Sequence, residues 1–161
     1  MPSQPLGELC RINPRRENRI LADSECSFVP MESVNEQFGR IIQMVTRRVA
    51  DVQTGYSRFR ERDILFAKIT PCMENGKCAI ATNLVNGIGF GSTEFHVLRP
   101  SQDVLPEWVF YFLRQEQVRK EAEHRMTGSA GQKRVPKAFL EELHMPCPSL
   151  PEQQHSIAIL Q

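Results

Sequence analysis

The side chains that could do catalytic or metal chemistry do not form a recognised pattern. Cys72, Cys78 and His96 are conceivable metal ligands, but five residues separate the two cysteines, and paired zinc ligands usually stand two to four residues apart. Gly76-Lys77 looks like the end of a phosphate-binding loop, yet Cys78 follows where Ser or Thr must hold magnesium. We therefore predict no catalytic residues, no metal and no cofactor, and we interpret the five cysteines as buried free thiols.

Cationic side chains gather in two segments of a chain that is nearly neutral overall. The 161 residues carry 20 Lys and Arg against 19 Asp and Glu, a formal net charge of +1. Residues 40–70 hold seven cations and three acids, and residues 125–137 hold four cations and no acid. Two such segments can form a patch that attracts an anionic partner, although solvated surface is the other interpretation of the same charges.

The hydrophobic pattern predicts a protein of the α+β class. Apolar runs at 28–34, 40–49, 64–69, 78–84 and 95–98 are typical of strands, although 40–49 fits a helix as well. Asn75-Gly76 and Asn86-Gly87 are typical of hairpin turns between strands. Residues 6–12 fit either a short helix or a strand.

Helices are predicted in the second half of the chain. One long helix is expected over 106–125, because Pro106 suits the first helical turn and an apolar stripe follows at helical spacing. After a Gly/Ser-rich loop we expect a short helix over 136–143, an extended segment over 144–148 and a helix from 151 onward. No run approaches the roughly 18 apolar residues that span a bilayer, and no apolar signal sequence stands at the N-terminus, so we expect a cytoplasmic protein without membrane contact.

Five short blocks follow one another along the chain. They are FRERDILFAKITP (59–71), CMENGK (72–77), GSTEFHVLRP (91–100), TGSAGQKRV (127–135) and PSLPEQ (148–153). Each block alone is weakly specific. Their series resembles the target recognition domain of the specificity subunit of type I restriction–modification enzymes, and it covers most of the chain from about residue 28 onward.

The resemblance implies a fold and a function. The expected fold is a bent, partly helical β layer followed by an α/β part, and the expected function is recognition of one half of a gapped sequence in double-stranded DNA. Methylation and cleavage would belong to the methyltransferase and restriction subunits, which are the expected protein partners. A protein-binding or RNA-binding assembly domain that has lost DNA recognition is the alternative.

The resemblance also implies a domain organisation. Residues 1–150 would form one target recognition domain, and 151–161 would begin a spacer helix that is truncated here. In proteins of this kind, long helices join two recognition domains and seat the methyltransferase subunits. A second recognition domain, or a second copy of the chain, could therefore associate through the C-terminal helix.

We expect the DNA contacts in the two basic segments. The candidates are Arg47, Arg48, Arg58, Arg60, Lys68, Lys77, Gln132, Lys133 and Arg134. Lys68 and Lys77 follow apolar strands and could meet phosphate, while a turn at the surface is the other interpretation of Lys77. Gln132 could pair with adenine and Arg134 with guanine. The alternative for 127–134 is a simple connector between two helices.

Overall fold

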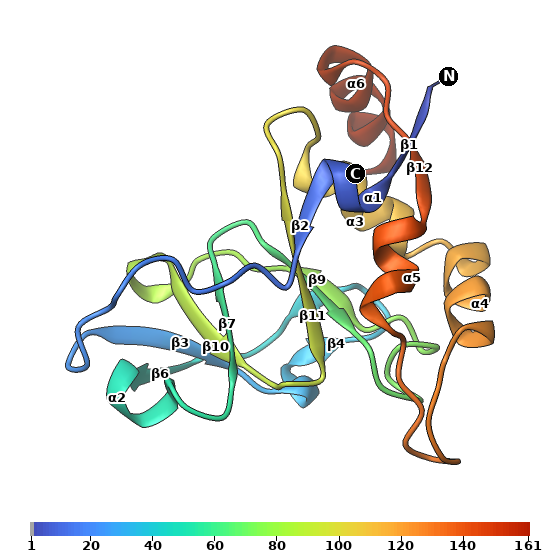
Figure 1. Cartoon of the computed structure of the whole chain (residues 1–161). Coiled ribbons are helices and arrows are strands. Elements are labelled where there is room, and N and C mark those ends of the chain that lie inside the picture. Colours follow the sequence, from blue (N-terminus) through green and yellow to red (C-terminus); the bar gives the residue numbers. More distant parts are fainter. Residues whose placement is uncertain (1) are drawn as a thin grey trace.

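The computed structural model describes residues 2–161, and its centre is an antiparallel sheet that we call the central sheet (Figure 1). Its strands are β2 (Cys10–Ile12), β8 (Ile64–Ala67), β9 (Cys78–Ile80) and β11 (Phe95–Pro100). They lie in the order β2-β11-β8-β9, and each neighbouring pair is antiparallel. All four residues of β8 are buried on both faces of the sheet, in agreement with the continuous apolar run that predicts this strand.

A second sheet, which we call the outer sheet, lies beside the central one. It contains β3 (Glu25–Val29), β6 (Val45–Arg48), β7 (Ser57–Arg60) and β10 (Ile88–Gly91) in the order β6-β3-β10-β7. The central pair, β3 and β10, is parallel, and the other pairs are antiparallel. Two short pairings join β1 (Ser3–Pro5) to β12 (His144–Pro146) and β4 (Val34–Asn35) to β5 (Arg40–Ile41).

Most of the helices lie at one end of the molecule, where both termini are also found (Figure 1). The helices are α1 (Leu6–Leu9), α2 (Val49–Val52), α3 (Pro106–Leu113), α4 (Glu116–His124), α5 (Lys137–Glu142) and α6 (Leu150–Leu160), with 3-10 turns η1 (Met31–Ser33) and η2 (Val85–Gly87). Within residues 2–161, none of these helices has the length and apolar character needed to cross a membrane. The mixed architecture confirms the α+β class.

Three apolar clusters hold these layers together. The largest lies between the central sheet and helices α1, α3, α4 and α5. A second fills the space between the two sheets, and a third lies under α2 on the far face of the outer sheet. Between the sheets, Phe59 lies against Gly89, where an added Cβ would stand 2.1 Å from the Phe59 ring. Only glycine leaves room for this ring at that position.

The predicted long helix over 106–125 is wrong, because the chain forms α3 and α4 with a break at Arg114 and Gln115. Gln115 has an extended backbone (φ −60°, ψ 137°). The reason lies in the core residues Leu113 and Val118, which are both buried. In one continuous helix, residues five apart would point about 140° away from each other. The break turns both side chains toward the same core.

The two predicted hairpin turns are confirmed in part at most. Asn75-Gly76 does connect two paired antiparallel strands, β8 and β9, but it is the end of a long connection, and only Gly76 of the two has a positive φ. Asn86 and Gly87 do have the left-handed φ values of a tight turn, 56° and 69°. They nevertheless join β9 in the central sheet to β10 in the outer sheet, so the flanking strands do not pair with each other.

Two other segments form more helices and strands than their sequence patterns predict. Residues 40–49 form β5, β6 and the first residue of α2 instead of one strand or helix, and residues 6–12 form both α1 and β2. The strand expected over 28–34 begins earlier, at Glu25, and gives way to η1 after Val29.

Candidate nucleic-acid interface

One face of the outer sheet carries arginines around an aromatic centre. Arg58 stands opposite Phe90 in the register of β7 and β10, and Arg60 stands two residues further along β7 on the same face. Phe59, between them, points the other way into the cluster between the sheets. Arg47 on β6 lies opposite Cys26, which shares the Phe90 face. The alternation of the strands therefore sorts Arg47, Arg58 and Arg60 to one side.

The segment 13–19 crosses this face and adds further cations. Arg16 donates from Nη1 to the Gln53 carbonyl at 2.5 Å and from Nη2 to the Tyr56 carbonyl at 2.9 Å. Its guanidinium carbon lies 5.4 Å from the centre of the Phe90 ring, a cation–π distance. Arg58 in turn donates to the Asn18 carbonyl at 2.6 Å. These bonds hold an irregular segment against β7.

A shallow pocket forms where the segment meets the sheet. Arg15, Arg16, Arg58, Arg60 and Arg99 line it together with a single acid, Glu17. Partial burial and the nearby guanidiniums of Arg16 and Arg99 lower the pKa of Arg58. An anion at this pocket would relieve the repulsion between these like charges.

Asp63 organises the far end of the same region. Its carboxylate is 1% exposed and accepts from Arg99 Nε at 2.9 Å and from Arg99 Nη2 at 2.7 Å. It also accepts from the backbone N–H of Arg60 at 2.9 Å. The aspartate thus ties β11 of the central sheet to the end of β7 in the outer sheet. It fixes the Arg99 side chain and the Arg60 backbone at the pocket.

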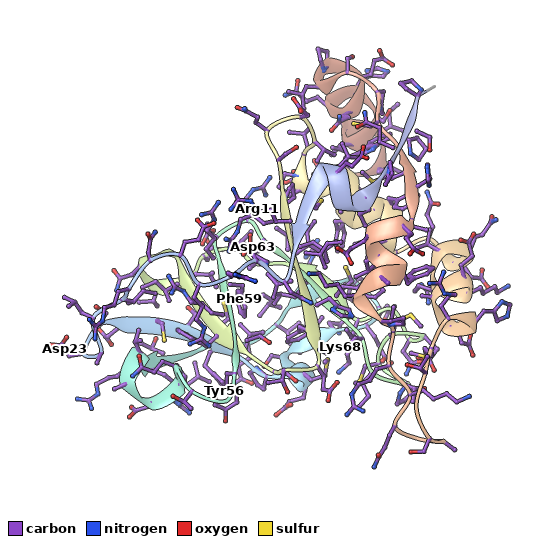
Figure 2. All side chains as sticks on the ribbon, viewed as in Figure 1. Arg11, Asp23, Tyr56, Phe59, Asp63 and Lys68 are labelled. Carbon is purple, nitrogen blue, oxygen red and sulfur yellow. The ribbon has the colours of Figure 1, made fainter. Side chains whose placement is uncertain are left out.

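Lys68 extends the cationic region toward the second basic segment. A further pocket next to the first is lined by Arg16, Tyr56, Arg58 and Lys68. Figure 2 places Tyr56 and Lys68 toward the lower side of the view, the side from which the connection between α4 and α5 protrudes. The Lys68 backbone is bonded on both sides, since its N–H donates to Glu94 and its carbonyl accepts from Val135, each at 2.8 Å.

Arg134 lies beside Lys68 but already has a carboxylate partner. Its Nε and Nη2 donate to Glu94 in a bidentate pair with distances of 2.8 Å. The hydrogen bond from Arg134 is the main cause that lowers the pKa of Glu94. A base that binds Arg134 would have to compete with Glu94, so the free guanidinium that the sequence indicates is not what the fold presents.

The loop 127–134 is a narrow, fully exposed hairpin. Thr127 and Arg134 exchange two backbone hydrogen bonds of 3.0 and 2.9 Å, and Gln132 N–H donates to the Ser129 carbonyl. Gly128 and Gly131 have positive φ values of 120° and 81°, which the tight turn requires. Gln132 and Lys133 are exposed on this projection. The segment connects two helices, as the alternative interpretation holds, and it also presents a protruding tip.

The structure does not bring all nine candidates together. Six of them follow one another along one surface, together with Arg15 and Arg16. This surface, which we call the basic surface, consists of Arg15, Arg16, Arg58, Arg60, Lys68 and the loop residues 132–134. Arg47 shares the face but stands three strand spacings, about 14 Å, from β7.

Two further candidates lie outside the basic surface. Arg48 points to the opposite side of the outer sheet from Arg47, as the register with Glu25 shows, and it pairs with Asp51 at 3.8 Å. The Lys77 ammonium is half-buried and donates to the Met31 carbonyl at 3.1 Å. Neither cation is placed next to the pocket on β7.

Sequence reasoning missed the cations of the N-terminal segment. Residues 11–19 (RINPRRENR) contain four arginines and one acid, a density as high as that of the segments singled out above. The segment has no regular structure in 13–19, and its position on the outer sheet depends on carbonyls some 40 residues away. Charge density alone would have identified it.

The cysteines show no arrangement for a metal. Cys10, Cys26 and Cys78 are buried, and Cys72 and Cys147 are half-buried, so the interpretation as buried thiols is confirmed for three of the five. Burial raises the pKa of Cys10 and of Cys78 to about 12. Among residues 2–161, no three His, Cys, Asp or Glu side chains come close enough to share a metal ion.

Comparisons with known proteins find relatives over nearly the whole chain. The chain is 41% identical over 153 residues to the specificity subunit of the type I restriction enzyme EcoAI from Escherichia coli, covering 94% of this chain and 26% of that protein. It is 39% identical over 150 residues to the EcoEI specificity subunit of the same species, covering 92% of this chain and 25% of that protein. The chain thus spans about a quarter of the length of these curated relatives.

A solved structure has the same fold at low sequence identity. The crystal structure of the HsdS subunit from Thermoanaerobacter tengcongensis superposes with a TM-score of 0.78 and 19% identity, covering 99% of this chain and 40% of that one. The family model for the type I restriction modification DNA specificity domain matches residues 4–161. On that match, which spans nearly the whole chain, this protein belongs to the type I restriction modification DNA specificity domain family.

Proposed function

We propose that this chain recognises a specific sequence in double-stranded DNA, as one half of the gapped target of a type I restriction–modification complex. The observation that carries the proposal is the family match over residues 4–161. The basic surface supports it independently, because Arg15, Arg16, Arg58 and Arg60 lie together at one pocket of a chain that is nearly neutral overall. The assembly domain that binds protein or RNA has no such observation in its favour.

The basic surface suggests a division of labour among its residues. Arg15, Arg58, Arg60 and Lys68 would contact phosphates, which position a duplex without reading its sequence. The hairpin 127–134 would enter a groove, where the Gln132 amide can pair with adenine and Lys133 can reach a phosphate. Arg134 would hold Glu94 in place unless a base displaces it.

We propose that catalysis lies outside this chain. Methylation and cleavage would be carried out by the methyltransferase and restriction subunits, which would be its protein partners on DNA in the cytoplasm. Residues 1–150 would be the recognition domain, and α6 would begin the spacer helix. Its exposed Ile159 and Leu160 form an apolar surface with Trp108 and Tyr111 that further protein could cover.

The test is to select preferred duplexes from a random pool and to titrate the selected and scrambled sequences over a range of salt. Arg15→Ala should weaken binding to both duplexes alike and reduce the slope of log K against log salt by about one. Lys120→Ala is the matched control, because it removes one charge from the exposed side of α4. Gln132→Ala should instead lower discrimination at one base pair by about 1–3 kcal/mol.

The outcomes separate the candidate functions. No enriched sequence together with no salt-dependent binding to any duplex would refute the DNA proposal and favour the assembly domain. Equal losses for Arg15→Ala and Lys120→Ala would refute the assignment of the basic surface while leaving DNA binding intact.

A further inference from the structure

His96 connects two parts of the basic surface that are far apart in the sequence. The imidazole is 3% exposed and sits on β11, opposite Phe66 of β8. Its Nε2 lies 2.7 Å from the carbonyl of Val135, the residue that follows the hairpin 127–134. Its Nδ1 lies 3.0 Å from Nδ2 of Asn13, the residue with which the segment 13–19 begins.

The hydrogen bonds of Asn13 fix the proton on this ring. The backbone N–H of Val97 donates to Asn13 Oδ1 at 2.9 Å, so that end of the amide is the oxygen. The other end is therefore the NH2 group, which donates to His96 Nδ1. Nδ1 must then carry no proton, and the single ring proton sits on Nε2 and is donated to Val135. One tautomer of the neutral imidazole satisfies both partners.

A second proton on the ring would break this arrangement. Protonated Nδ1 would face the NH2 group of Asn13, donor against donor, and the side-chain bond between Asn13 and the ring would be lost, leaving Asn13 held by its two bonds to Val97. The charged groups around the ring are Lys68, Lys137 and Glu94. Burial and the two lysines disfavour the imidazolium, Glu94 and the bond to Val135 favour it, and the net effect is a lowered pKa for His96.

We propose that neutral His96 is a positioning residue for DNA recognition, which holds the arginine segment 13–19 and the hairpin 127–134 at a fixed separation. The phosphate contacts and the groove contacts then meet one duplex in register. This inference rests on the proposed function and adds a residue that touches no DNA itself. Its signature is a pH dependence of sequence discrimination that comes from a buried group.

The two sides of the ring can be tested separately in the chain of residues 1–161. In His96→Gln, the longer amide can still donate to Val135, but it places no acceptor at the position of Nδ1, which faces Asn13. In His96→Asn, the shorter amide can still accept from Asn13, but the donor to Val135 is lost. Each variant should lower the ratio of affinities for selected and scrambled duplexes by about tenfold, since one buried hydrogen bond is lost in each.

The variant Asn13→Asp distinguishes the proposed positioning role of His96 from a merely structural role. The aspartate carboxylate still accepts from the Val97 N–H. It has no proton to donate to the ring, so a hydrogen bond with the ring requires a proton on His96 Nδ1. In the wild type, discrimination should decline as the pH falls below the ordinary histidine value of 6.5. In Asn13→Asp the decline should disappear, and 15N spectra of the ring should show the imidazolium persisting to higher pH than in the wild type.

Several results would overturn the inference. In the wild type these are a ring proton on Nδ1 in the neutral ring, or a discrimination ratio that does not change over the pH range in which 15N spectra show the ring taking up its second proton. Unaltered discrimination in both folded His96 variants would do the same. If either variant fails to fold, the wild-type and Asn13→Asp pH profiles still decide the matter. A wild-type chain that shows no sequence preference at any pH refutes the proposed function itself and with it this role of His96.

Discussion

Replacing Asp63 by alanine should lower the unfolding free energy more than any substitution at the surface, because Asp63 joins the two sheets. The carboxylate accepts three hydrogen bonds, two from the Arg99 guanidinium and one from the Arg60 backbone N–H. Alanine removes all three acceptors at once. The Arg99 side chain, which is 15% exposed, keeps its charge without a partner, and the Arg60 N–H loses its acceptor.

The magnitude follows from that exposure. Removing one partner of a fully buried ion pair costs about 3–5 kcal/mol, mostly because the remaining charge is left unpaired. Water can reach part of Arg99, so we expect the lower end, about 3 kcal/mol of unfolding free energy. For a chain of this size, 1 kcal/mol corresponds to about 2–4 °C in Tm, so Tm should fall by roughly 6–12 °C.

Urea denaturation followed by circular dichroism measures the loss directly. Asp63→Asn is the matched variant, because its amide oxygen can still accept from Arg60 or Arg99 while the charge is gone, and its loss should be smaller. Arg62→Ala breaks the more exposed pair with Glu107 and should cost less than 1 kcal/mol. A loss below 1 kcal/mol for Asp63→Ala, or equal losses for the alanine and asparagine variants, would refute the view that this carboxylate joins the sheets.

Three further predictions concern other contacts. Glu94→Gln removes a negative charge and weakens the hold on Arg134, so binding to selected and scrambled duplexes should both strengthen and the salt slope should rise by about one in filter-binding titrations. The pKa of His96 is lowered, so the unfolded chain binds more protons than the folded one below pH 6.5. The unfolding free energy measured by urea titration should therefore decline below that pH, and it should decline less in His96→Gln. Gly89→Ala should cost about 3 kcal/mol by forcing Phe59 aside, and Phe59→Leu should recover part of that loss.

The sequence predicts most of the central strands because buried strands have a recognisable local pattern of apolar residues. Residues 64–67 are apolar without interruption, and they form the buried strand β8. The pairing of strands into sheets has no such local pattern in the sequence. β9 and β10 follow each other in the chain but belong to different sheets, and β10 pairs in parallel with β3, some 60 residues earlier. Such pairing is set by how the layers pack, which turn residues do not encode.

The candidate site was predicted in part, and the reasons differ from residue to residue. Arg58 and Arg60 were identified by the excess of cations in residues 40–70, and the structure places them on one face of β7, a strand that the pattern did not predict. Arg134 is a cation in a flexible-looking loop, but its pairing depends on Glu94, 40 residues away. Lys77 follows the same pattern as Lys68, yet the Met31 carbonyl lies within reach of its ammonium. A charge pattern identifies cations but not the acceptors that the fold supplies to them.

Two of the five blocks that carry the family resemblance, 59–71 and 91–100, contain much of the buried core of the central sheet. In the block 59–71, Phe59 and residues 63–67 are buried, and Asp63 is committed to Arg99 and Arg60. His96 lies within the block 91–100, where it is buried between Asn13 and Val135. These residues build and align the scaffold, whereas the cations of 13–19 and the hairpin 127–134, which is itself part of a block, are exposed. A shared motif can therefore identify the family without identifying the bases that a member recognises, because these two blocks specify how the exposed surface is held.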